Sequence, residues 1–241
     1  MADDLLRMTD TDASSGGRRD IQREWPAWLL LAVLWAFSFW AKGHLPARTP
    51  MHWNLQGAVD GWGSPLEAAL LLPGLATVVY LVILAFDWGR LDFKAARAMS
   101  PATTRQIRLL VMLLMAGLQG LVLGAALRGG ALHSSRTMVL LCLFCICLGN
   151  LMPRLEPNAW AGIRIPPTLE NRDVWKRTHR LGGRWLLISG LVGLPLCLLP
   201  EPLANLLPVP IIVLPLLMAT IYAYWLRHHM EHHASHLTES R

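Results

Sequence analysis

Residues 66–86 read LEAALLLPGLATVVYLVILAF, and this stretch decides the class of fold. Apart from Glu67 near its start it carries no charged side chain, and it is long enough for a helix to cross about 30 Å of hydrocarbon. Inside a bilayer only helices and closed barrels satisfy every backbone polar group. The stretch therefore predicts a transmembrane helix.

Five further apolar blocks accompany it, at residues 25–41, 107–127, 137–152, 185–199 and 206–226. Several are short for a span, so their flanks must extend them by about a turn. Charged residues make up only 16% of the chain, below the roughly one quarter usual in soluble domains, which favours a membrane protein. We expect an all-α, polytopic integral membrane protein with about six transmembrane helices.

The basic residues predict how these helices are oriented. Eighteen of the 22 lysines and arginines precede the first block, follow the sixth, or lie after the second and fourth. The other four are Lys42, Arg48, Arg128 and Arg136. By the positive-inside rule both termini are cytoplasmic, in a multi-pass protein of the bacterial inner membrane. Cytoplasmic loops of this kind explain the net charge of +6, so we expect no direct nucleic acid binding.

This orientation divides the chain into three parts. Residues 1–24 form a cytoplasmic tail expected to be flexible, and 25–226 form the membrane domain, with an outward loop at 42–65 and a cytoplasmic loop at 153–184. Residues 227–241 form a histidine-rich cytoplasmic tail whose histidines recur four residues apart. That spacing can hold zinc or nickel, or it makes a titratable tail with adventitious metal affinity. We expect no cofactor and no metal.

The positions of the cysteines also agree with a membrane protein. Cys142, Cys145, Cys147 and Cys197 all lie inside apolar blocks, where thiols usually act as small hydrophobic groups. A soft-metal site would need Cys142, Cys145 and Cys147 together with a fourth ligand in a dry helix. We interpret them as packing residues.

The outward loop reads KGHLPARTPMHWNLQGAVDGWGSP and is not an ordinary short connection. Its prolines force extended backbone on the residues before them, and Asn54, Gly57 and the pair Asp60-Gly61 supply turn chemistry. We therefore expect an ordered loop. The favoured interpretation is a structural re-entrant turn in which His52 caps backbone carbonyls, and the alternative is a polar site at which His52, Asn54 and Asp60 converge.

The cytoplasmic loop is equally unusual. Residues 158–167 predict a structured turn, followed by a helix capped by Thr168 or Asn171. One face of that helix carries Val174, Trp175, Thr178 and Leu181, and its other faces are basic. We expect Gly182-Gly183 to end or bend it. A basic amphipathic helix of this kind lies on anionic headgroups or binds a soluble protein partner.

These two loops carry a resemblance to a known family. The cytoplasmic loop resembles the signature of the SdpI immunity family in Asn158, Gly162, Ile163, Arg164, Pro166, Thr168, Leu169, Val174, Trp175, His179, Arg180, Gly182 and Gly183. The outward loop is similar to the companion motif of these proteins, of the DUF1648 type, in Pro50, His52, Trp53, Asn54, Gly57, Asp60 and Gly61. The chain departs from the signature at Ile165, where Thr is usual, and at Pro167, where Trp is usual.

The resemblance implies immunity to a secreted, membrane-disrupting peptide toxin. It also implies signalling, because the family's namesake holds a soluble repressor at the membrane when toxin is present. The outward motif would then face a peptide toxin and the cytoplasmic signature would face the repressor, with the lipid bilayer as the surrounding partner.

A second hypothesis is a transporter or membrane enzyme acting on a lipid-linked or peptide substrate. His52 and Asp60 would form its outer site, and Arg164 and His179 would contribute at the inner face. The chain shows no G-x-S-x-G, H-E-x-x-H or Walker motif, so we expect no enzyme. A substrate path also needs ionisable groups within the bundle, and the blocks offer almost none. Recognition is therefore favoured over transport.

Overall fold

The computed structural model describes residues 23–54, 57–87, 99–130, 132, 134–158, 160–200 and 203–239. Predictions about the N-terminal tail before Arg23, about the basic residues Arg90, Lys94 and Arg97, and about the side chains of His233 and His236 lie outside the described residues. The elements are, in order, α2 (Trp25–Lys42), β1 (Thr49–Trp53), β2 (Val59–Gly63), α3 (Pro65–Asp87), α4 (Pro101–Leu127), α5 (Ser134–Leu151), η2 (Met152–Arg154), α6 (Pro166–Glu170), α7 (Arg172–Leu196), α8 (Leu203–Leu206) and α9 (Pro208–Glu239).

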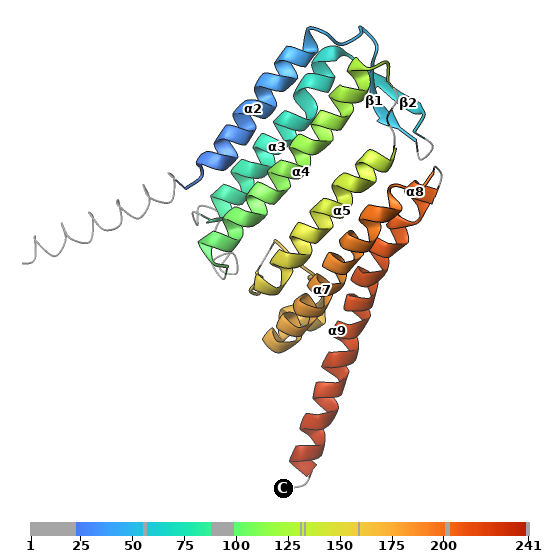
Figure 1. Cartoon of the computed structure of the whole chain (residues 1–241). Helices are drawn as coiled ribbons and strands as arrows, with labels where there is room; N and C mark the ends of the chain where they lie inside the picture. Colours follow the sequence, from blue (N-terminus) through green and yellow to red (C-terminus); the bar gives the residue numbers. More distant parts are fainter. Residues whose placement is uncertain are drawn as a thin grey trace, which may run out of the picture.

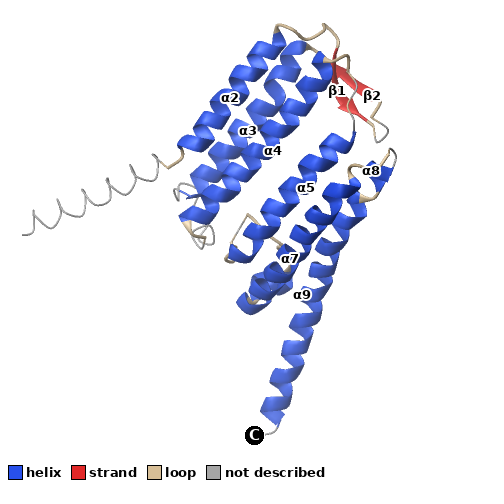
Figure 2. Ribbon diagram, in the orientation of Figure 1, coloured by secondary structure: helices blue, strands red, loops and turns tan. Residues whose placement is uncertain are grey.

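The described part of the chain is almost entirely helical, as Figure 2 shows, apart from one small antiparallel hairpin. Within the described residues, five helices are long and apolar enough to cross a membrane, namely α2, α3, α4, α9 and the helix formed by α5 with η2. The expectation of an all-α polytopic membrane protein is therefore confirmed, with β1 and β2 as an addition that the outward loop makes.

The expected span at residues 185–199 is not among these five helices. Most of it forms the second half of α7, whose first half carries Arg172, Lys176, Arg177 and Arg180. The two halves make one continuous helix, so Gly182-Gly183 does not end it. Both glycines are buried, and a β-carbon on Gly183 would lie 2.7 Å from the carbonyl oxygen of Gly149 in α5. The glycines serve close helix packing.

The long helices form two groups of three (Figure 1). In one group α2, α3 and α4 all contact one another, and in the other α7 packs between α5 and α9. Contacts between α4 and α5 join the groups. The hairpin lies at one end of the bundle, and the start of α2, the start of α7 and the end of α9 lie at the opposite end (Figure 1). We call these the hairpin end and the opposite end.

Side-chain caps fix where two of these helices begin. The hydroxyl of Ser100 accepts a hydrogen bond from the backbone N–H of Thr103 at the start of α4. The amide oxygen of Asn171 accepts from the N–H groups of Asp173 and Val174 at the start of α7. The prediction that Thr168 or Asn171 caps this helix is confirmed for Asn171, whereas Thr168 lies inside α6.

Candidate functional site

The outward motif folds as a β-hairpin because its turn residues satisfy one another. The carbonyl of Asn54 accepts from the N–H of Gly57, and its side-chain oxygen accepts from the N–H of Ala58 at 3.0 Å. Gly57 has a φ of 77°, a backbone conformation that glycine adopts without steric cost. Asn54 and Gly57 therefore build the turn, which brings His52 of β1 opposite Gly61 of β2.

The hairpin brings two of the three predicted polar residues together. The Nδ1–H group of His52 donates to the carboxylate of Asp60 across a distance of 2.5 Å, and both side chains are exposed. A β-carbon on Gly61 would lie 2.6 Å from that of His52, so a glycine is required for the two strands to approach here. His52 and Asp60 thus converge, but Asn54 is occupied by the turn, and His52 bonds a carboxylate rather than a carbonyl.

Trp53 anchors the hairpin instead of facing outward. Its indole N–H donates to the carbonyl of Gly130, after the end of α4, at 2.6 Å, and the side chain is half-buried. A β-carbon on Gly130 would meet Pro50 at 3.1 Å, so Gly130 packs closely against β1. The exposed aromatic is Trp62, with the guanidinium of Arg48 4.7 Å from its ring centroid. Trp62 lies outside the quoted motif, so sequence reasoning missed it.

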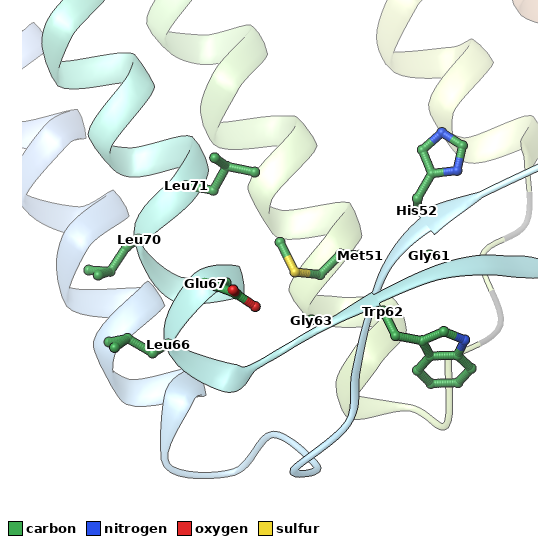
Figure 3. A pocket seen from close by; sticks show the side chains of 9 residues that line it. All are labelled: Met51, His52, Gly61, Trp62, Gly63, Leu66, Glu67, Leu70 and Leu71. Atoms are coloured by element: carbon green, nitrogen blue, oxygen red, sulfur yellow. The ribbon is translucent and has the colours of Figure 1, made fainter.

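An open groove of about 780 Å³ lies between the hairpin and the start of α3. We call it the hairpin groove, and it is lined by Met51, His52, Gly61, Trp62, Gly63, Leu66, Glu67, Leu70 and Leu71. Figure 3 shows Met51 and Glu67 next to each other between the hairpin and α3, with the three leucines spread along α3. All three leucines are exposed. The groove thus joins a polar rim on the hairpin to an apolar wall on a candidate membrane span.

At the opposite end, the signature residues build a compact loop against α7. The side chain of Asn158 is buried, and its oxygen accepts from the N–H groups of Trp160 and Ala161. Its amide donates to the carbonyls of Glu156 and Ala161. One asparagine therefore satisfies four backbone groups, which fixes the turn that leads to Gly162.

His179 holds that turn from the other side. Its Nδ1–H donates to the carbonyl of Trp175 at 2.9 Å, and its Nε2 accepts from the N–H of Ile163 at 2.9 Å. With one nitrogen donating and the other accepting, the ring is neutral. Burial lowers the pKa of His179, although the hydrogen bond to the Trp175 carbonyl acts in the opposite direction. Gly162, at a φ of 113°, leaves room for the imidazole.

Trp175 and Thr168 complete the same arrangement. The fully buried indole of Trp175 stacks on His179 and donates to the carbonyl of Leu155 at 2.7 Å. The hydroxyl of Thr168, also buried, lies within hydrogen-bond distance of the carbonyls of Ile163 and Ile165. The polar atoms of these side chains are hydrogen-bonded to backbone groups, so they present no polar atom to a ligand.

The remaining signature residues lie either at the surface or in a contact between helices. Arg164 and Pro166 are exposed, and Gly182 is buried beside Ala219 of α9. Within the described segments, no hydrogen bond or ion pair of the Arg164 side chain is formed. Arg164 and His179 therefore do not act together as an inner site: one faces solvent and the other is enclosed.

A buried ion pair escaped the sequence reasoning. Arg108 of α4 pairs with the carboxylate of Glu24, which precedes α2, and both side chains are buried. Tyr80 of α3 donates to the same carboxylate and accepts from the indole N–H of Trp28. The network ties α2, α3 and α4 together at the opposite end. Its one sequence signal is that Arg108 lies inside the block at 107–127.

Cysteine and histidine side chains were also candidates for a metal. Cys142 and Cys145 are buried and Cys147 is exposed. The Nε2 atoms of His228 and His232 lie 3.1 Å apart on α9. Across the residues whose placement is described, no group of three or more His, Cys, Asp and Glu side chains is arranged to hold a metal ion.

The geometry defines a class: a polytopic α-helical membrane protein with one ordered loop at each end of its bundle. Residues 29–77, which contain the hairpin, match a family described as a domain of unknown function, DUF1648. Residues 154–226, which contain the signature loop, match the SdpI/YfhL protein family. The two segments follow one another in the order of the two loops, and the chain is similar to the SdpI/YfhL family over its C-terminal part.

A curated relative carries the same resemblance. The immunity protein SdpI of Bacillus subtilis (strain 168) is 29% identical to this chain over 82 residues, which are 34% of this chain and 40% of the relative. The chain thus matches less than half the length of that relative. No solved structure matches the chain.

Proposed function

We propose that this protein confers resistance to a membrane-active peptide, which it recognises at the hairpin groove. The observation that carries the proposal is the composition of the groove, which has the exposed His52 at one side and Leu66, Leu70 and Leu71 at the other. A membrane-active peptide has polar and apolar faces, and a site spanning the boundary between water and lipid can contact both. The relative named as an immunity protein supports the same function.

A signalling role extends this proposal. The exposed Arg164 and the basic residues on the first half of α7 form a cationic surface at the opposite end. Such a surface suits an acidic patch on a soluble repressor, provided that this end is cytoplasmic, as the positive-inside rule predicts. The protein would then act without catalysis, in the bacterial inner membrane, as a receptor whose two faces lie at opposite ends of one bundle.

Transport or catalysis is the weaker candidate. It needs polar side chains that converge inside the bundle or at its inner mouth. His179 is enclosed and bonded to backbone on both ring nitrogens, and Arg164 is exposed. The buried Glu24 and Arg108 neutralise each other, which suits a structural pair.

Deletion of the gene in its native host tests the proposal. The deletion strain and a strain complemented with the wild-type gene are challenged with a panel of membrane-active peptides. We expect a lower inhibitory concentration for at least one peptide in the deletion strain, restored by the wild-type gene. Unchanged sensitivity to the whole panel would refute resistance. An Arg164→Ala complement separates the roles, because it should restore resistance while weakening any repressor recruitment.

A further inference from the structure

The lining of the hairpin groove contains one carboxylate, that of Glu67 in the first turn of α3. Glu67 forms a capping box with Ser64. Its backbone N–H donates to the Ser64 hydroxyl at 3.2 Å, and the backbone N–H of Ser64 donates to Oε2 of Glu67 at 2.6 Å. Among the described residues, no hydrogen bond or ion pair reaches the second oxygen, Oε1. The box therefore holds the carboxylate in place and leaves one oxygen for a ligand.

The carboxylate lies where the hairpin meets the apolar wall of the groove. A β-carbon on Gly63 of β2 would lie 2.8 Å from Oε2 of Glu67, so the strand passes close beside it. The wall follows on the same helix, with the exposed side chains of Leu66, Leu70 and Leu71. A ligand that reaches the carboxylate from the groove therefore also contacts the leucines.

The charges around the groove leave Glu67 without a counterion. His52 is the other ionisable residue of the lining, and it is bonded to the carboxylate of Asp60, so these two together carry no net positive charge. Arg48 contacts the lining through the ring of Trp62, with its guanidinium 4.7 Å from the ring centroid. Within the described segments, no ion pair joins Arg48 to Glu67. The groove thus offers an unpaired anion to whatever binds there.

The depth of Glu67 makes this charge effective. α3 is a candidate membrane span that begins at Pro65, so the carboxylate lies at the boundary between water and lipid. Two charges attract each other more strongly beside a medium of low dielectric constant than in bulk water. Peptides that bind membrane surfaces as amphipathic helices carry lysine and arginine on one face and apolar side chains on the other. A peptide of this kind matches both the carboxylate and the leucines.

We propose that the hairpin groove selects cationic amphipathic peptides, with a lysine or arginine side chain of the peptide paired with Glu67. The apolar face of the peptide lies against Leu66, Leu70 and Leu71. This inference rests on the proposed function, because it names the class of peptide and the residue that selects it. Loss of the charge on Glu67 removes the preference for cationic peptides and leaves the binding of uncharged analogues unchanged.

The test uses Glu67→Gln, because glutamine keeps the capping box and removes only the charge. The full-length protein, in nanodiscs of uncharged phosphatidylcholine, is titrated with two synthetic amphipathic peptides that share one apolar face. One carries lysines on its polar face and the other carries glutamines, and binding to protein-free nanodiscs is subtracted. We expect the wild type to bind the lysine peptide about tenfold more tightly, and Glu67→Gln to bind the two about equally. Glu231→Gln, at an exposed position on α9 outside the groove, should keep the wild-type preference.

The outcomes separate this inference from the proposed function. Equal binding of the two peptides by the wild type, or an unchanged preference in Glu67→Gln, would overturn selection by Glu67 and leave peptide recognition standing. No binding of either peptide to the wild type would refute recognition at the groove itself. If Glu67→Gln does not fold, salt tests the wild type alone: raising NaCl from about 50 to about 500 mM should weaken binding of the lysine peptide but not of the glutamine peptide. Equal salt dependence would overturn the inference.

Discussion

A β-carbon built on Gly162 would lie 2.3 Å from Nε2 of His179, the same atom that accepts a hydrogen bond from the backbone of Ile163. The glycine and the histidine are 17 positions apart and define one contact, in which the loop lies flat on the first half of α7. The signature loop is therefore held in one conformation by a ring buried beneath it.

Replacing Gly162 with alanine should be among the most destabilising single changes in the loop. The new methyl group meets the imidazole, and the φ of 113° disfavours any residue with a β-carbon. We expect a loss of about 2–4 kcal/mol of unfolding free energy. Gly129→Ala is the matched control, because its φ is 93° but nothing lies within 4 Å of its β-carbon position. Equal losses in the two variants, measured by denaturation in detergent, would exclude the contact with His179.

The buried His179 predicts a pH dependence of stability. Its pKa is lowered by burial from the ordinary value of 6.5, so below that pH the unfolded chain binds a proton that the folded protein excludes. Stability from this residue is complete above pH 6.5 and declines as the pH falls below it. Unfolding curves at pH 7.5 and 5.5 should separate for the wild type and move closer together for His179→Gln. An equal separation in the two proteins would contradict a buried neutral ring.

The contact between α5 and α7 should depend on the absence of a side chain at Gly183. A methyl group there would lie 2.7 Å from the carbonyl oxygen of Gly149, and because this is backbone, a whole helix must move. We expect Gly183→Ala to cost about 1–3 kcal/mol. Gly120→Ala, in a helix with nothing within 4 Å of the added carbon, should be neutral or slightly stabilising. Thermal unfolding of the two variants measures both effects: the unfolding temperature should fall for Gly183→Ala and should not fall for Gly120→Ala.

The ion pair between Glu24 and Arg108 should be more important for stability than an exposed pair. Arg108→Met leaves a buried carboxylate without its cation, which should lower the unfolding free energy by about 3–5 kcal/mol. The double variant Glu24→Gln/Arg108→Met removes both charges and should recover much of that loss. Chemical denaturation of the three proteins measures both effects. A single variant as stable as the wild type would show that the pair is not needed.

The His52–Asp60 pair should behave in the opposite way. Both side chains are exposed, so His52→Ala should change the unfolding free energy by less than about 1 kcal/mol. If the hairpin groove recognises a peptide, the same variant should nevertheless lower the inhibitory concentration of that peptide in a complemented strain. Loss of stability in step with loss of resistance would mean that His52 is only structural.

The sequence predicted the parts of the fold that depend on local chemistry. The lengths of the apolar blocks predicted where the long helices lie. Asn54 and Gly57 predicted a turn, and Asn171 predicted a helix cap, and the structure contains both. Gly182-Gly183 misled because glycine weakens a helix in isolation. Here the close approach of α5 stabilises the helix through those positions, and no local pattern contains that information.

The candidate site was predictable in its residues but less so in their roles. A polar site with His52 and Asp60 was the less favoured interpretation of the loop, and the pairing of β1 with β2, which the sequence analysis did not predict, brings the two together. Trp53 and His179 have polar atoms that seemed available, yet their partners are backbone groups of Gly130 and Ile163, far away along the chain. Glu24 and Arg108 are 84 positions apart; Arg108 was counted only among the basic residues between two spans, and Glu24 was placed in the N-terminal tail.

The inhibitory concentration of a membrane-active peptide against complemented deletion strains tests the central claim most directly. The wild type is compared with Leu70→Gln/Leu71→Gln in the hairpin groove and with Leu198→Gln, an exposed leucine after the end of α7 and outside the groove. At matched protein levels in the membrane, the wild type and Leu198→Gln should restore resistance, whereas the groove variant should not. Full resistance from the groove variant would contradict recognition at the hairpin groove.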